Sequence, residues 1–248
     1  MARIPMAIQL YSVRKDCAED LPGTLAALAE MGYAGVEFAG YHDRSAAELR
    51  RLLDDLGLQA AGSHVRGHEL APENLPATLE FHQTLGNRYL IIPWMDPSDD
   101  RQMWLDLAKR LNAAAEKLAP HGLRTGYHNH GHEFKPITGE TPWDIVAGNT
   151  RPEVVMQLDL GNACHGGADP MAYLRKYLDR AGTVHLKEFS ATNDQPLIGE
   201  GDIPWAEALD TIEAGGTTEW YIVEQEVYPV APLEAAKRCR EFLRTLGR

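Results

Sequence analysis

The chain has 248 residues, of which 44% are hydrophobic and 24% are charged, a composition typical of globular proteins. Its net charge of −12 argues against nucleic-acid binding, because phosphate backbones require a basic surface. The three cysteines are scattered, and no apolar segment approaches the roughly 20 residues that span a bilayer, so we expect a cytoplasmic protein without disulfides or a membrane partner.

Short apolar runs alternate with amphipathic segments of helical length along the whole chain. The expected strands are residues 4–10, 33–38, 58–64, 88–94, 123–129, 153–159, 183–189 and 220–225. The expected helices are residues 20–32, 45–57, 71–86, 99–122, 141–149, 169–182, 203–216 and 231–247. Repeated βα units without a linker predict an α/β fold, a (β/α)8 TIM barrel forming a single domain over residues 1–248. An open doubly wound sheet is the alternative, which the absence of a glycine-rich loop after the first strand disfavours.

Polar residues stand at the end of almost every expected strand, which is where TIM barrels place their active sites. They are Glu37, His64, Trp94, Asp159, His185, Lys187, Glu224 and Glu226. Several carboxylates at one barrel mouth would repel one another or lose solvation unless a cation neutralised them. Oxygen-rich ligands with one histidine favour Mn²⁺, Mg²⁺ or Co²⁺ over a structural zinc ion.

The segment 127-YHNHGHEF-134 places three histidines on one face of an extended strand. The pattern alone is compatible with a metal site, a proton-transfer site or a polar strand end. We expect His128 and His130 to border the pocket and His132 to point towards a loop or solvent. The segment 191–205, rich in turn-forming residues, is expected to form a loop over the same pocket.

Several motifs together resemble the xylose-isomerase-like barrels, which include sugar isomerases, epimerases and inosose dehydratases, and above all the subgroup of sugar phosphate isomerases/epimerases. The motifs are QLYSVR (9–14), GYHNHGHEF (126–134), QLDLGNA (157–163), GGADPMAYLRKY (166–177), VHLKEF (184–189), GEGDIPW (199–205) and IVEQE (222–226). They cover almost the whole chain and are specific for the superfamily, not for a substrate.

The resemblance implies a divalent metal held by a glutamate of the fifth strand, together with Asp159, His185 and Glu224. The fifth strand departs from the pattern, because its end reads Tyr127-His128 where epimerases carry the glutamate. We expect Glu133, beyond the strand end, to be the fourth ligand. The alternative is that His128 replaces the missing carboxylate, and this departure leaves the catalytic base open.

The resemblance further implies a metal-dependent isomerase or epimerase of carbohydrate metabolism that converts a keto- or aldo-sugar through an enediolate. We expect Glu133, Glu224, His128 and Lys187 to be catalytic, and the small-molecule sugar to contact Glu37, His64, Trp94 and His130. The main alternative is a lyase of the same fold, dehydrating an inosose or a 3-keto-sugar. A metal-dependent endonuclease and a non-catalytic sugar-binding barrel are further alternatives, and relatives of this type are often homo-oligomers.

Overall fold

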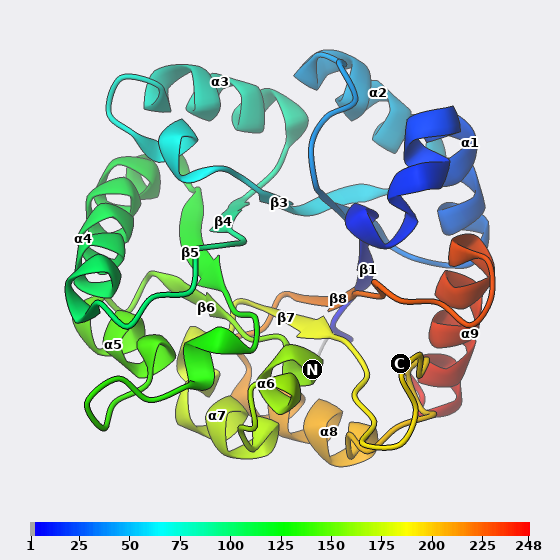
Figure 1. Ribbon diagram of the computed structural model, residues 1–248. Helices are drawn as coiled ribbons and strands as arrows, with labels where there is room; N and C mark the ends of the chain where they lie inside the picture. The colour runs from blue at the N-terminus through cyan, green and yellow to red at the C-terminus, as the bar shows by residue number, and fades with distance from the viewer. Residues whose placement is uncertain (1–2) are drawn as a thin grey trace.

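The computed structural model describes residues 3–248 and shows a ring of strands surrounded by helices (Figure 1). The strands are β1 (Met6–Gln9), β2 (Gly35–Phe38), β3 (Gln59–His64), β4 (Tyr89–Ile92), β5 (Arg124–His128), β6 (Val155–Gln157), β7 (Thr183–Leu186) and β8 (Trp220–Val223). All neighbouring pairs are parallel, in the order β6-β5-β4-β3-β2-β1-β8-β7. A parallel bridge between Asp159 and His185 joins the end of β6 to β7, so that the barrel is nearly closed. The predicted TIM barrel is confirmed.

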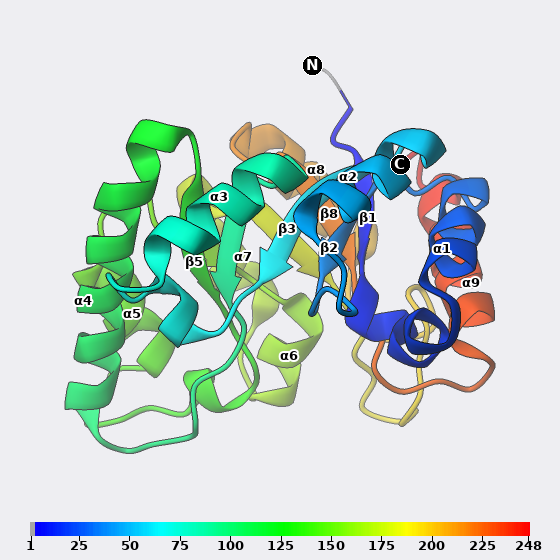
Figure 2. The same cartoon turned by 90° about the horizontal axis from the view of Figure 1, so that it is seen from above.

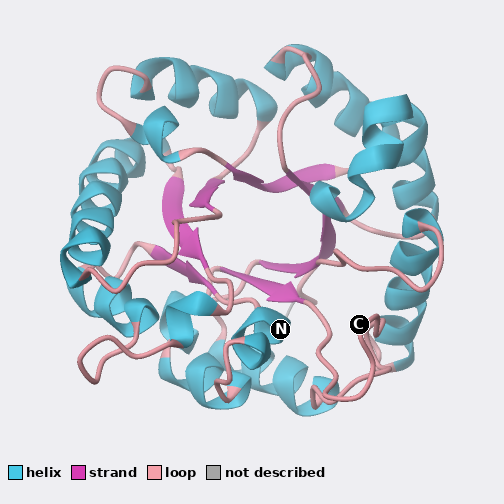
Figure 3. Cartoon of the chain, viewed as in Figure 1, coloured by secondary structure: helices cyan, strands magenta, loops and turns pink. Residues whose placement is uncertain are grey.

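The helices pack around the outside of the strands (Figures 2 and 3). They are α1 (Arg14–Glu30), α2 (Ala46–Leu56), α3 (Leu75–Leu85), α4 (Arg101–Leu118), α5 (Pro142–Asn149), α6 (Leu160–His165), α7 (Pro170–Lys176), α8 (Trp205–Gly215) and α9 (Pro232–Thr245). Within residues 3–248, no helix is both long and apolar enough to cross a bilayer.

Two details show how local sequence sets these elements. Helix α1 starts earlier than expected but is interrupted at Asp20, which has non-helical backbone angles and accepts a hydrogen bond from the Gly23 amide. Helix α2 begins with a capping box between Ser45 and Glu48 and ends at Gly57, whose left-handed conformation favours glycine. Helix α6 was not predicted, because six residues are too few to show helical periodicity.

The barrel interior is divided into an apolar layer and a polar layer. Ala7, Ala61, Tyr89, Ile91, Val155, Trp220 and Ile222 form a separate buried apolar cluster. Two residues further along their strands, Gln9, Gln157 and Glu224 replace Ala7, Val155 and Ile222 on the same face. The strand alternation therefore places polar groups above an apolar plug, at the carboxyl end of the barrel.

Candidate active site

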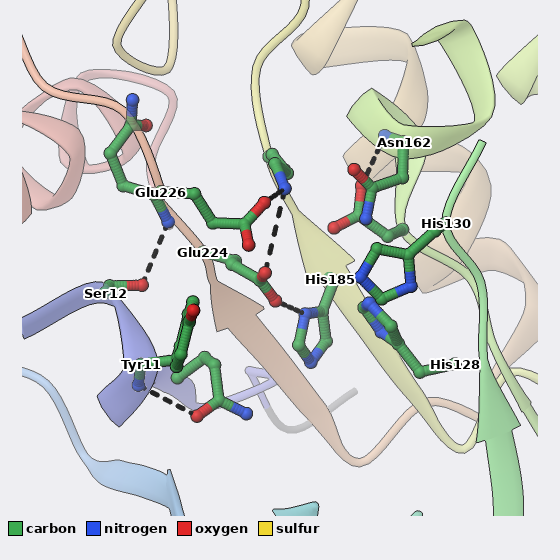
Figure 4. Close-up of polar contacts among 12 residues, drawn as sticks. Tyr11, Ser12, His128, His130, Asn162, His185, Glu224 and Glu226 are labelled. Carbon is green, nitrogen blue, oxygen red and sulfur yellow. Dashed lines mark hydrogen bonds and ion pairs between the residues drawn. The ribbon is translucent and has the colours of Figure 1, made fainter. Parts of the chain in front are cut away.

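Four side chains from consecutive barrel segments converge at the carboxyl ends of the strands. His128, Asp159, His185 and Glu224 each offer a ligand atom, and these atoms all lie within 4.8 Å of one another. All four residues are buried. Figure 4 shows His128, His185 and Glu224 turned towards one another from β5, β7 and the segment after β8.

Asp159 follows β6 and caps the short helix α6. Its Oδ1 atom accepts a hydrogen bond of 2.7 Å from the Asn162 amide, whereas its buried Oδ2 atom has no hydrogen-bond partner among residues 3–248. Burial raises the pKa of this carboxyl to about 7. An orphaned, buried carboxylate oxygen is unusual in a folded protein and indicates a missing cationic partner.

His185 lies between two carboxylates. Its Nδ1 atom is 2.5 Å from Glu224 Oε2, and its Nε2 atom is 2.7 Å from Glu37 Oε2. Burial opposes the charged imidazolium, but Glu37 and Glu224 outweigh it and raise the pKa of His185 to about 10. In this arrangement both ring nitrogens donate, so a proton on His185 balances part of the negative charge.

The orientation of Gln157 determines the tautomer of His128. The Nε2 atom of Gln157 donates to the Glu37 carboxylate at 2.9 Å and to the Thr183 hydroxyl at 2.8 Å. The Gln157 Oε1 atom therefore faces His128 Nδ1 at 3.1 Å, and it can only accept a hydrogen bond. His128 carries its proton on Nδ1, which leaves the lone pair of Nε2 free.

Glu133 does not join this cluster. Its buried carboxylate accepts hydrogen bonds from the Tyr127 hydroxyl at 2.6 Å and the His130 amide at 2.8 Å, and it lies 3.1 Å from His132 Nε2. The expected placement of Glu133 at the ion is therefore not what the structure shows. Because the chain turns into a short 3-10 helix (His132–Phe134), Glu133 points back behind β5 and His128 takes its place.

A cavity of about 600 Å³ opens above the cluster. It is lined by Gln9, Tyr11, Ala39, Gly40, Tyr41, His64, Val65, Arg66, Glu69, Pro93, Trp94, His128, His130, Glu224 and Glu226. Of the residues expected to contact the sugar, His64, Trp94 and His130 line this cavity. Trp94 is 47% exposed and packs edge-on against His130. The buried His130 Nδ1 atom has no hydrogen-bond partner within residues 3–248.

Glu37, also expected to contact the sugar, instead lies fully buried beneath the cavity. Its carboxylate already accepts hydrogen bonds from Gln9 and Gln157 and contacts His64 and His185. Gln9 and Gln157 were not predicted from the sequence as site residues, although Gln157 lies two residues before Asp159 on the same strand face. The two-residue spacing could have identified Gln157 as a residue near the site, because alternate residues of a strand share a face.

Lys187 extends the polar group towards the cavity edge. Its ammonium contacts Glu226 and lies 3.7 Å from Glu224 Oε1. Burial opposes its charge, but Glu224, Asp159 and Glu226 outweigh this and raise the pKa of Lys187. Lys187 and His185 in turn hold the pKa of Glu224 below its usual range, against the effect of burial.

The loop 191–205 does not cover the cavity as expected, because none of its residues lines it. The buried Glu188 carboxylate holds this loop, accepting hydrogen bonds from the Gly199 amide at 2.7 Å and the Trp205 indole at 2.6 Å. The loop is therefore anchored beside β7 and α8.

The residues present fit a divalent cation. Asp159 Oδ2 is a donor without a hydrogen-bond partner in the described part of the chain, and a proton on Nδ1 leaves the Nε2 lone pair of His128 as a second donor. His185 could exchange its Nδ1 proton for a metal while Nε2 remains bonded to Glu37, an arrangement common around metal-bound histidines. The mixture of carboxylate and imidazole donors suits Mn²⁺, Co²⁺ or Zn²⁺ ions.

The chain is similar to several known proteins. It is 24% identical to the rhizopine catabolism protein MocC of Rhizobium meliloti, covering 88% of this chain and 79% of that protein. It is 23% identical to the inosose dehydratase of Clostridium tetani, covering 88% and 87% respectively. A crystal structure of a sugar phosphate isomerase/epimerase from Parabacteroides distasonis superposes with a TM-score of 0.84 at 23% identity, covering 98% of this chain and 97% of that one.

The family model described as xylose isomerase-like TIM barrel matches residues 25–246. This match spans all strands from β2 to β8 and includes the four clustered residues. The chain therefore belongs to the xylose isomerase-like TIM barrel family, and it is an enzyme.

Proposed function

We propose that this protein is a divalent-metal-dependent lyase that removes water from a cyclic keto-polyol of the inosose type. The inosose dehydratases among its relatives favour this alternative over the isomerase or epimerase that the motifs first suggested. The observation that carries the proposal is the distribution of carboxylates. Glu224 and Glu226, both after β8, adjoin the cluster and the cavity, whereas Glu133 is enclosed behind β5.

This distribution matters because an epimerase must remove a proton from one face of a carbon and return one from the other. The β5 side of the cavity offers the imidazoles of His128 and His130 in place of a carboxylate. Burial lowers the pKa of His130 to about 4 and that of His128 well below its usual range. Both are neutral at neutral pH, so neither is a ready proton donor to carbon.

His128, Asp159, His185 and Glu224 would hold the ion. When bound, the ion would polarise the substrate ketone and so acidify the neighbouring C–H bond. The chain's own residues would position the ring. The His64 Nε2 atom is bonded to Gln157 Oε1 at 3.0 Å, which orients the imidazole at the cavity wall, and His130 and Trp94 would contact hydroxyl groups and the apolar ring face.

Glu226 is the residue that we propose moves the proton. Glu226 lines the cavity, and its carboxylate contacts the Lys187 ammonium. It would take the proton from the carbon beside the ketone while the C–O bond to the next hydroxyl breaks and a C=C bond forms. The resulting Glu226 carboxylic acid would return this proton to the departing hydroxyl, which leaves as water. One residue then serves as base and acid, with no net change in protons.

The proposal is tested by incubating the Mn²⁺-loaded protein with an inosose in deuterated water and following the product by mass spectrometry. A lyase gives a product lighter by one water, whereas an epimerase or isomerase gives the unchanged mass plus deuterium. We expect Glu226→Gln to lower turnover at least about 100-fold, the usual weight of a general base, while Mn²⁺ binding persists.

The matched control is Glu241→Gln, the same change at an exposed position on α9, which should leave turnover unaltered. Asp159→Asn should abolish both Mn²⁺ binding and turnover. Deuterium incorporation without loss of water would overturn the lyase assignment in favour of an epimerase. Full activity of Glu226→Gln would overturn the assignment of the proton-transfer residue.

A further inference from the structure

One cation at the cavity wall has no role in the chemistry proposed above. Arg66 lies two residues after the end of β3, immediately before a 3-10 helix (Gly67–Leu70). It lines the cavity. Its side chain is exposed. Across the described residues 3–248, no carboxylate lies within 4.0 Å of its guanidinium group.

The nearest acidic residue in the chain is already committed to another partner. The Glu69 Oε1 atom accepts a hydrogen bond of 2.7 Å from the backbone amide of Arg66. This hydrogen bond holds the Glu69 carboxylate at the backbone of Arg66, where it does not form an ion pair with the Arg66 guanidinium group. The same bond also fixes the turn from which the Arg66 side chain projects.

Some surface arginines pair with a carboxylate, as Arg88 does with Glu219 and Arg101 with Glu140. Others, such as Arg51, have no carboxylate within 4.0 Å among residues 3–248, and Arg66 differs from Arg51 in that it lines the cavity. Arginine presents a planar fork of donors that matches the two oxygens of a carboxylate or phosphate group. An unpaired arginine at a cavity wall is thus well suited to an anionic ligand.

Arg66 is not a member of the ion cluster, although His64, two residues earlier at the end of β3, lies beside His128 and His185. β3 lies across the barrel from β7 and β8, which supply His185 and Glu224 (Figure 1). A ring of six carbons held with its ketone at the cluster would present its far end towards the β3 side. A volume of about 600 Å³ accommodates such a ring with one additional substituent.

We propose that the substrate carries an oxyanion, a carboxylate or a phosphate monoester, at the end remote from the ketone, and that Arg66 binds this group. The inference rests on the proposed function, because it assumes that the substrate occupies the same cavity. It makes Arg66 a residue that determines specificity, distinguishing acidic cyclic polyols from neutral ones.

The test compares three non-reacting probes with the Mn²⁺-loaded protein by calorimetry: myo-inositol, quinate and myo-inositol 1-phosphate. All are cyclohexane polyols, but the first is neutral, the second carries a carboxylate and the third a phosphate monoester. We expect at least one anionic probe to bind at least about tenfold more tightly than myo-inositol, as charge-assisted hydrogen bonds predict. The better of the two identifies which anion the site takes.

Arg66→Gln should remove this preference and leave the affinity for myo-inositol unchanged, whereas Arg66→Lys should keep part of it. The matched control is Arg51→Gln, at an exposed arginine on α2 that does not line the cavity. Equal affinity for neutral and anionic probes, no binding of either anion, or an anion preference that survives in Arg66→Gln would each overturn the proposal. None of the probes contains a ketone, so these outcomes are independent of whether the enzyme proves to be a lyase or an epimerase.

Discussion

Hydrogen bonds around His128 would prepare its imidazole as a metal ligand, and the residues that make them lie outside the four-residue cluster. Gln157 Oε1 accepts a hydrogen bond from His128 Nδ1. Hydrogen bonds to Glu37 and Thr183 fix the orientation of the Gln157 amide. A neutral imidazole that carries its proton on Nδ1 keeps a lone pair on Nε2, which is a good donor to a divalent cation. Such outer hydrogen bonds typically contribute 10–100-fold to metal affinity.

We therefore predict that His128→Ala lowers Mn²⁺ affinity by at least about 100-fold, because it removes a donor, and that Glu133→Gln changes it less than about threefold. Glutamine can still accept the hydrogen bond from the His130 amide through its one oxygen, and its amide NH2 group can donate to the Tyr127 hydroxyl oxygen. Calorimetric titration of each variant with Mn²⁺ measures the difference. The opposite ranking would show that Glu133 moves to the ion when the metal binds.

The sequence predicted the direction of a side chain correctly where that direction follows from the alternation of residues along a strand. Asp159, His185 and Glu224 were expected together, and their ligand atoms do lie together, because His185 lies within β7 and the other two come just after the buried strands β6 and β8. Glu133 lies beyond the strand end, where alternation no longer applies. Its direction is set by the turn at Gly131 and by the Tyr127 hydroxyl, which spacing in the sequence does not encode.

At the scale of elements, the approach of β5 to β6 brings His128 and Gln157 into register. Gly126 pairs with Val155, and His128 pairs with Gln157 two residues later. A Cβ atom at Gly126 would lie 2.1 Å from the Val155 carbonyl oxygen and 2.7 Å from its Cβ atom. Only glycine permits this separation of the two strands.

Gly126→Ala should destabilise the protein by about 1–3 kcal/mol, the usual cost of overpacking a core, and should also weaken Mn²⁺ binding by shifting His128. Chemical denaturation monitored by circular dichroism gives the first quantity and calorimetry the second. Gly148→Ala is the matched control, since a Cβ atom there meets nothing within 4 Å and the residue lies in helix α5. Equal stability of the two variants would mean that β5 and β6 can separate without cost.

Strand and helix types were predictable, whereas their ends were less so. The strand expected over 153–159 ends at Gln157, because Asp159 caps α6 and pairs with His185 only through an isolated bridge. A helix of six residues that begins two residues after its strand shows no hydrophobic period of its own. The path of loop 191–205 depends on the buried Glu188 carboxylate, a long-range contact that turn-forming residues do not reveal.

At the scale of the whole molecule, the eightfold alternation of strand and helix was sufficient to predict the barrel, because parallel strands joined by helices must close or wind as an open sheet.

Stability against acid is also a property of the whole molecule, and it depends on buried groups remote from the cluster. His82 of α3 is 1% exposed, and its Nδ1 atom is 2.9 Å from Asn87 Nδ2, an amide donor. Its Nε2 atom is 3.3 Å from the Tyr41 hydroxyl. The folded state therefore requires a neutral His82 that accepts at Nδ1.

Burial lowers the pKa of His82 to about 4 from 6.5, so the unfolded state binds its proton more readily than the folded state does. Stability from this group is complete above about pH 6.5 and is lost as the pH falls towards 4, by about 1.4 kcal/mol per unit and about 3 kcal/mol in all. His82→Gln retains an acceptor for Asn87 but does not titrate. The slope of unfolding free energy between pH 6.5 and 4, measured by urea denaturation, should therefore be smaller in this variant by about 1 kcal/mol per pH unit.

A second variant, His121→Gln at an exposed histidine, should retain the wild-type slope. If His82→Gln also retained it, His82 would have to accept a proton in the folded state, and the Asn87 amide would have to turn its oxygen towards the ring.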